Sequence, residues 1–179
     1  MSKEFPTPGN FEERFSIELL KRDIRSLLLG GVACLTYGST RFTKDTDWWL
    51  DSTMGIPAWV KRLMEVANGC EMPCEWTRLR GNQNLGSFPK DVGSGSLSVR
   101  VEEAVREDSM VRIGTMESFV DVFYQPHRLS DFQAAWERSC EFDGCLRRLS
   151  IADLIESKLD TARHQDEEDI RYLRSLKKE

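Results

Sequence analysis

The segment from Leu27 to Asp51 constrains the fold more than any other part of the chain. Along it lie, in order, the apolar triplet Leu27–Leu29, the glycines Gly30 and Gly31, the mostly apolar run Val32–Tyr37, the polar stretch Gly38–Lys44 and the strand-like segment Asp45–Asp51. Glycine pairs permit tight turns between periodic segments. The pattern therefore predicts a short strand, a sharp turn, a short helix, a loop and a second strand.

The remainder of the sequence predicts further elements of a single α+β domain over residues 1–179. We expect helices over residues 10–25, 57–66, 131–140 and 150–177, and strands at Cys74–Leu79, Leu97–Val101, Met110–Ile113 and Phe119–Tyr124. Residues 1–9 read as a loose tail, and residues 81–95, which hold four glycines, read as a mobile loop. Together these elements predict a mixed β-sheet flanked by helices, with C-terminal helices over 150–177.

Three carboxylates form a candidate metal site. Asp45 and Asp47 stand two residues apart in one predicted strand, so their side chains point to one face, with Cα atoms about 6.6 Å apart. Asp121 lies in a second apolar strand, where an ionised carboxylate needs a partner. If the two strands are neighbours, the three carboxylates meet on one surface. Oxygen ligands of this kind suit Mg²⁺ or Mn²⁺.

Composition excludes several classes of function. The net charge of −5 argues against a general nucleic-acid-coating protein, which needs clustered Lys and Arg. No apolar run approaches the roughly 20 residues that span a bilayer, and the N-terminus lacks the apolar core of a signal peptide. We therefore expect a cytoplasmic protein without membrane contact.

The five cysteines are expected to be reduced thiols, because their number is odd and no signal peptide is evident. The pairs Cys70 with Cys74 and Cys140 with Cys145 have a spacing that a zinc site tolerates. Neither pair lies in a glycine-rich knuckle. Ordinary buried or half-buried cysteines are the preferred interpretation.

The glycine turn and the carboxylates belong to a longer pattern, Gly30-Gly31-x-Ala33-x3-Tyr37-Gly38-x2-Arg41-x-Thr43-x-Asp45-x-Asp47. This pattern resembles the active-site signature of the DNA polymerase β-like nucleotidyltransferase superfamily, and within it the AbiEii-like and related small bacterial nucleotidyltransferases. The run from Asp153 to Ile170 is similar to the C-terminal helical motif of that group. The resemblance covers residues 27–51, 118–124 and 150–173. Tyr37 stands where those proteins often have His, and Trp48-Trp49 replaces an aliphatic pair.

The resemblance implies a nucleotidyltransferase fold and a set of site residues. Asp45, Asp47 and Asp121 would hold Mg²⁺ or Mn²⁺, and Asp121 would help to activate the attacking hydroxyl. The nucleotide would contact the residues Gly30, Gly31, Arg41, Thr43 and Lys158. The implied reaction moves an NMP from an NTP to a hydroxyl acceptor, which is a small molecule, an RNA or a protein. Toxin-like relatives imply an antitoxin-type protein partner.

Simpler interpretations stand beside these roles. Arg41 equally suits a salt bridge to a surface acid, and Thr43 suits a turn. Lys158 either extends past the core or points at acidic groups, and the second is preferred. Asp166 and Asp169 match the dipole at the start of a helix. For the whole chain, the alternatives are a non-catalytic nucleotide- or metal-binding or interaction module on the same fold, and a purely structural interaction protein.

Overall fold

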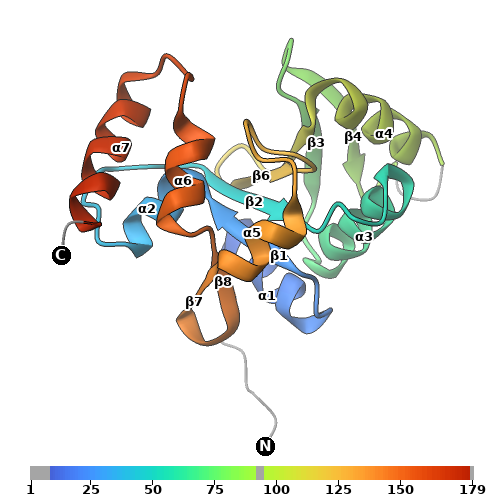
Figure 1. Cartoon of the computed structure of the whole chain (residues 1–179). Coiled ribbons are helices and arrows are strands. Elements are labelled where there is room, and N and C mark those ends of the chain that lie inside the picture. Colours follow the sequence, from blue (N-terminus) through green and yellow to red (C-terminus); the bar gives the residue numbers. More distant parts are fainter. Residues whose placement is uncertain (1–8, 92–94, 178–179) are drawn as a thin grey trace, which may run out of the picture.

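The computed structural model describes residues 9–91 and 95–177, which form a mixed sheet flanked by helices (Figure 1). The helices are α1 (Phe11–Lys21), α2 (Gly30–Thr36), α3 (Ile56–Gly69), α4 (Ser96–Asp108), α5 (Phe132–Arg138), α6 (Ile151–Lys158) and α7 (His164–Leu176), with the 3-10 turn η1 (Asp143–Cys145). The strands are β1 (Ser26–Leu29), β2 (Thr46–Leu50), β3 (Cys74–Arg78), β4 (Gln83–Phe88), β5 (Met110–Gly114), β6 (Phe119–Phe123), β7 (Cys140–Phe142) and β8 (Leu146–Arg148). The predicted combination of a mixed sheet with flanking helices is confirmed.

The sheet has eight strands in the order β4-β3-β5-β6-β2-β1-β8-β7. The pairs β2 with β6 and β1 with β8 are parallel, and the other neighbours are antiparallel. Strands β1 and β2 therefore lie in the middle of the sheet, and later strands are added on both sides of them. The segment that most constrains the fold is also its centre.

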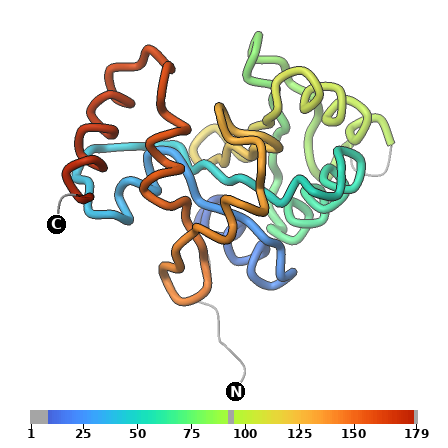
Figure 2. The backbone as a smooth tube through the Cα atoms, in the orientation of Figure 1, coloured from blue at the N-terminus to red at the C-terminus, as the bar shows by residue number. Residues whose placement is uncertain are grey.

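Two groups of helices lie at opposite ends of the molecule, and α1 and α5 lie between them (Figures 1 and 2). Helices α3 and α4 pack against each other, and α4 also contacts β3, β4 and β5. At the other end, α6 and α7 pack together and both contact α2. The C-terminal helices consequently lie beside the short helix that Gly30 begins.

The two faces of strand β2 have different neighbours. On one face, the Thr46 hydroxyl donates to the Glu12 carboxylate of α1 at 2.6 Å. On the other, Trp49 meets the ring of Phe132 in α5 edge-on, with ring centroids 5.2 Å apart. Trp48 and Trp49 are both fully buried in the core. By alternation, Asp47 shares the face of Trp49, away from α1.

Helix starts follow the predicted capping residues. The side chain of Asn10 accepts a hydrogen bond from the Glu13 amide, and that of Ser150 accepts one from the Asp153 amide. Helix α1 ends at Lys21, earlier than expected, because the backbone turns through a positive φ of 51° at Asp23. Helix α7 begins at His164, within the predicted C-terminal region.

Three local predictions were wrong or incomplete. Residues 97–101, expected as a strand, lie in helix α4, whose buried residues Leu97, Val101, Ala104 and Val105 recur at helical spacing. Five alternating residues are too short a window to separate the two periods. Within the predicted mobile loop 81–95, strand β4 pairs with β3 and buries Leu85. Residues 140–148 form a β7–β8 hairpin. It was not predicted because each of its strands is only three residues long.

Parts of two predictions lie outside the described residues, namely 1–8 of the loose tail and 92–94 of the loop. Within the described ranges, none of the helices combines the length and apolar character that crossing a membrane requires.

Candidate active site

The candidate site is built on a row of paired residues that crosses four strands. Leu29 of β1 pairs with Asp47 of β2, which pairs with Asp121 of β6, which in turn pairs with Arg112 of β5. Residues paired in this way project from the same face of a sheet. Asp47 and Asp121 are 74 positions apart in the sequence, but this pairing makes them direct neighbours in the sheet. The predicted adjacency of the two carboxylate strands is confirmed.

Asp47 lies directly against the glycine turn. Gly30 has a positive φ of 66°, and a Cβ on it would overlap the Asp47 carboxylate. Although part of Asp47 is still exposed, burial raises its pKa to about 8, with further contributions from the negative charges of Asp121 and Asp45. Lys158 and Arg112 act in the opposite direction and offset only part of this effect. Asp47 is thus the carboxylate of the row whose charge is least compensated.

Asp121 has a strong partner that the sequence did not indicate. Its carboxylate is 5% exposed and accepts two hydrogen bonds from Arg112, from Nε to Oδ1 at 2.7 Å and from Nη2 to Oδ2 at 2.8 Å. Asp45 lies just before β2, is half exposed, and has its Oδ2 3.7 Å from Arg112 Nη2. The Asp121 hydrogen bonds and the three neighbouring carboxylates raise the pKa of Arg112, which stays charged.

Gly31 makes room for two other predicted residues. A Cβ at this position would lie 2.5 Å from Arg41 Nη2 and 2.7 Å from Thr43 Oγ1. Arg41 and Thr43 therefore reach the glycine turn, as the predicted site requires. The space that a side chain at Gly30 or Gly31 would fill is occupied by Asp47, Arg41 and Thr43. The sequence analysis assigned these two glycines to contact with the nucleotide.

Arg41 and Lys158 are held by the same aspartate. Arg41 donates from Nε and Nη2 to the two oxygens of Asp169, at 2.7 and 2.9 Å. Lys158 Nζ lies 2.7 Å from Asp169 Oδ2 and 2.8 Å from Asp166 Oδ1. Burial alone would lower the pKa of Lys158, but the hydrogen bonds to Asp166 and Asp169 more than reverse this and raise it.

These contacts refine the expectation for the C-terminal helices. Lys158 does point at acidic groups, but its hydrogen-bonded partners are Asp166 and Asp169 rather than the strand carboxylates. Asp169 is 1% exposed, so its role is to bind the buried Lys158 and the partly exposed Arg41, beyond matching a helix dipole. Cys34 of α2 lies in the same cluster, and burial raises its pKa to about 12.

The described residues contain no preformed metal-binding site. In the described parts of the chain, no three His, Cys, Asp or Glu side chains are arranged as a group that could hold a metal ion. The zinc alternative loses its basis, since Cys70 and Cys74 are buried near β3 while Cys140 and Cys145 are exposed in the β7–β8 hairpin. Among the aspartates, both oxygens of Asp121 are engaged by Arg112.

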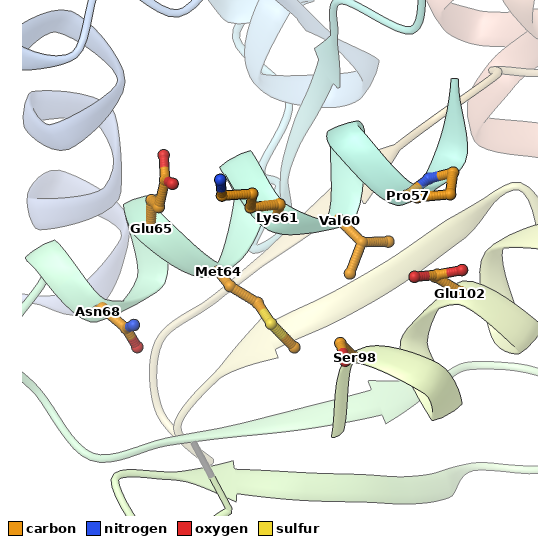
Figure 3. A pocket seen from close by; sticks show the side chains of 8 residues that line it. All are labelled: Pro57, Val60, Lys61, Met64, Glu65, Asn68, Ser98 and Glu102. Carbon is orange, nitrogen blue, oxygen red and sulfur yellow. The ribbon is translucent and has the colours of Figure 1, made fainter. Parts of the chain in front are cut away.

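A surface hollow of about 450 Å³ lies elsewhere, between α3 and α4. Val60 and Met64 of α3 face Ser98 and Glu102 of α4 across it (Figure 3). Its lining contains no member of the predicted site. The hollow is open to solvent, and the carboxylates that line it, Glu65 and Glu102, belong to α3 and α4.

Sequence reasoning missed Arg112 and the bridging role of Asp169. Arg112 lies in the predicted strand 110–113, but its position opposite Asp121 follows from the register of β5 and β6, which the structure shows. Asp169 carried no local signal, because its partner Arg41 is 128 residues away. Comparison with known proteins adds nothing here: no family model matches the chain, and no curated protein matches it with significance.

Proposed function

We propose that this protein is a metal-dependent nucleotidyltransferase on a nucleotidyltransferase fold. The observation that carries the proposal is the register of β2 and β6, which sets Asp47 directly beside Asp121, while Asp45 lies just before β2 with its Oδ2 3.7 Å from Arg112 Nη2. The glycine turn lies against Asp47, and Arg41 and Thr43 lie against the turn. The signature residues that are scattered over the sequence thus converge on one end of the central strands.

The chemistry of the donor set suits a divalent cation, although the three side chains are not arranged as a preformed metal site in the described parts of the chain. All three side chains offer carboxylate oxygens, the ligands that Mg²⁺ and Mn²⁺ prefer. Three carboxylates against one guanidinium leave a negative surplus when they are ionised, and Asp47 has no hydrogen-bonded cation of its own among the described contacts. Asp45, Asp47 and Asp121 would hold the metal. A bound metal would neutralise charge on the phosphates and orient them.

The chain's own residues account for the remaining steps. Arg41 reaches the glycine turn, where a triphosphate is expected, and Asp169 joins Arg41 to the second cation, Lys158. The acceptor hydroxyl forms a bond to the α-phosphorus while the bond to the β-phosphate oxygen breaks, and pyrophosphate leaves. Asp121 receives the hydroxyl proton.

The experiment is a transfer assay with labelled NTPs. The purified protein is incubated with each α-labelled NTP, Mg²⁺ or Mn²⁺, and candidate small molecules, RNA and protein, and products are identified by mass spectrometry. Transfer by the wild type, its loss in Asp47→Asn, and its retention in Asp108→Asn are expected. Asp108 is a matched control because it also pairs with an arginine, Arg78, outside the site. Equal transfer by Asp47→Asn would reject the site.

A second candidate, binding without turnover, is favoured by one observation. Arg112 occupies both oxygens of the carboxylate that would receive the proton. A binding module predicts that metal and NTP raise the melting temperature of the wild type, as ligands that prefer the folded state do, with no product formed from any NTP.

A further inference from the structure

The strongest feature that the proposed reaction does not use is the position of Arg112. Its guanidinium binds both oxygens of Asp121 and lies 3.7 Å from Asp45. The other side of the guanidinium covers the ring of Phe119, 3.8 Å from the ring centroid. Its side chain is 27% exposed, so water reaches one side of it. Arg112 is thus a cation that contacts Asp121 and lies close to Asp45.

The register of the tight β5–β6 hairpin fixes the position of Arg112. Strands β5 and β6 are joined by residues 115–118, where the Thr115 side chain and the backbone of Thr115 and Ser118 close the turn. This turn places Arg112 opposite Asp121 and Gly114 opposite Phe119. Gly114 leaves no room for a side chain, because a Cβ would come within 2.5 Å of Phe119 Cα. Slippage of the pair is therefore opposed at the turn.

The guanidinium and a divalent cation need the same oxygens. Metal binding at Asp121 would have to displace at least one of two short hydrogen bonds, and the two cations would repel each other. The stack on Phe119 does not involve Asp121, so it gives the guanidinium a place to remain once the carboxylate is released.

We propose that Arg112 is a positioning residue that acts as a built-in counter-cation: it holds Asp121 in the metal-free protein and sets the metal affinity of the site by competition. This inference rests on the proposed function, since it takes Asp45, Asp47 and Asp121 as the metal ligands. It adds a threshold concentration of divalent cation, below which the site stays empty of metal. The site fills only when the divalent cation outcompetes an internal arginine, and a nucleotide that brings its own metal supplies that advantage.

The test measures Mn²⁺ binding directly, from the electron paramagnetic resonance signal of free Mn²⁺ during titration. Arg112→Met is expected to bind Mn²⁺ about tenfold more tightly than the wild type, because a charge at this distance shifts such equilibria by about one to three powers of ten. Arg112→Lys keeps a charge but loses the paired hydrogen bonds, so its affinity should lie between the two.

Arg78→Met is the matched control. Arg78 lies on the adjacent strand β3 and donates from Nε to Asp108 at 2.7 Å and from Nη2 at 3.3 Å, away from the carboxylate row. It should leave Mn²⁺ affinity unchanged. Circular dichroism confirms folding of each variant, and a gain in affinity cannot arise from structural damage.

The outcomes separate the two proposals. Tighter binding by Arg112→Met, with or without measurable binding by the wild type, supports the competition. Equal or weaker binding by both folded Arg112 variants overturns it while leaving the metal site intact. Absence of Mn²⁺ binding in every protein rejects the metal site of the proposed function, and the competition with it.

Discussion

The carboxylate of Asp169 receives the guanidinium of Arg41 through two hydrogen bonds that join residues 128 positions apart in the chain. One of its oxygens also lies 2.7 Å from Lys158 Nζ. Helix α7 thereby holds the loop that precedes β2 and the end of α6 at the same point. The arrangement makes Asp169 a structural centre for two cations that the proposed reaction uses.

Replacing Lys158 should therefore cost stability as well as function. A lysine that only extended toward a nucleotide would be dispensable for folding, but Lys158 is 6% exposed and pairs with two aspartates. Lys158→Met should lower the free energy of unfolding by about 3–5 kcal/mol, the usual cost of leaving buried charges unpaired. Urea denaturation measures the change, and the same substitution at the exposed Lys61 is the control. A loss as small as that of Lys61→Met would contradict the ion-pair network.

Gly30 should tolerate alanine less well than a glycine in open space. Gly30 and Gly81 both have positive φ, 66° and 77°, but only the Cβ at Gly30 would overlap the Asp47 carboxylate. Gly81→Ala should lose about 1–2 kcal/mol from backbone strain. Gly30→Ala should lose a further 1–3 kcal/mol or so from overpacking.

Chemical denaturation of the two glycine variants gives this difference, and Mn²⁺ titration of Gly30→Ala then reports whether Asp47 has been displaced. Equal losses at Gly30 and Gly81 would show that Asp47 does not occupy the space beside the turn.

The ion pair of Lys158 and Asp166 predicts a pH dependence of stability. Burial alone would raise the pKa of Asp166, but hydrogen bonds from Lys158 and Thr161, with the charge of Arg163, lower it below its ordinary value of 3.8. The unfolded state then binds the proton more readily than the folded state. The contribution of Asp166 to stability is complete above 3.8 and is lost as the pH falls through the lower, folded-state pKa.

This dependence is checked by comparing the wild type with Asp166→Asn. The free energies of unfolding of the two proteins should differ most near neutral pH and converge as the pH falls below 3.8 and through the lower, folded-state pKa. At the alkaline end, the pKa of Lys158 is raised, so its contribution persists to above 10.5. A difference that stays constant down to the acid limit would show that Asp166 is not ionised in the folded protein through this pairing.

Cysteine reactivity tests the fold independently of function. Burial raises the pKa of Cys34, Cys70 and Cys74 to about 12, while Cys140 and Cys145 are exposed. Because the thiolate is the reactive form, iodoacetamide at neutral pH should label the exposed pair first. Peptide mapping by mass spectrometry identifies the order. Labelling of Cys74 as fast as Cys140 would contradict the packing of β3.

The central part of the fold was predictable because its signals are local and strong. The glycine pair, the apolar triplet before it and the Asp45–Asp51 pattern gave β1, α2 and β2 within a few residues. By contrast, residues 97–101 alternate for too short a stretch, and the helical period of α4 becomes evident only when Ala104 and Val105 are included.

The site was predictable in its carboxylates and less so in its cations. Asp47 and Asp121 were expected to be neighbours, and the parallel pairing of β2 and β6 makes them so. The partner of Asp121 depends on hairpin register, and the partner of Arg41 depends on how α7 packs. Neither register nor helix packing is encoded in a short motif, so both required the three-dimensional structure.

The central position of β1 and β2 has a consequence for biosynthesis. These strands leave the ribosome early. The outer edge of β2 stays unpaired until β6 is synthesised, and the outer edge of β1 stays unpaired until β8 is synthesised. At roughly 5–20 residues per second, the stretch from Leu50 to Leu146 takes on the order of 5–20 seconds to synthesise. Both outer edges are open until β6 is synthesised, and the β1 edge stays open until β8 follows. The two strands carry leucine and tryptophan, and exposed strand edges of this kind are prone to aggregation.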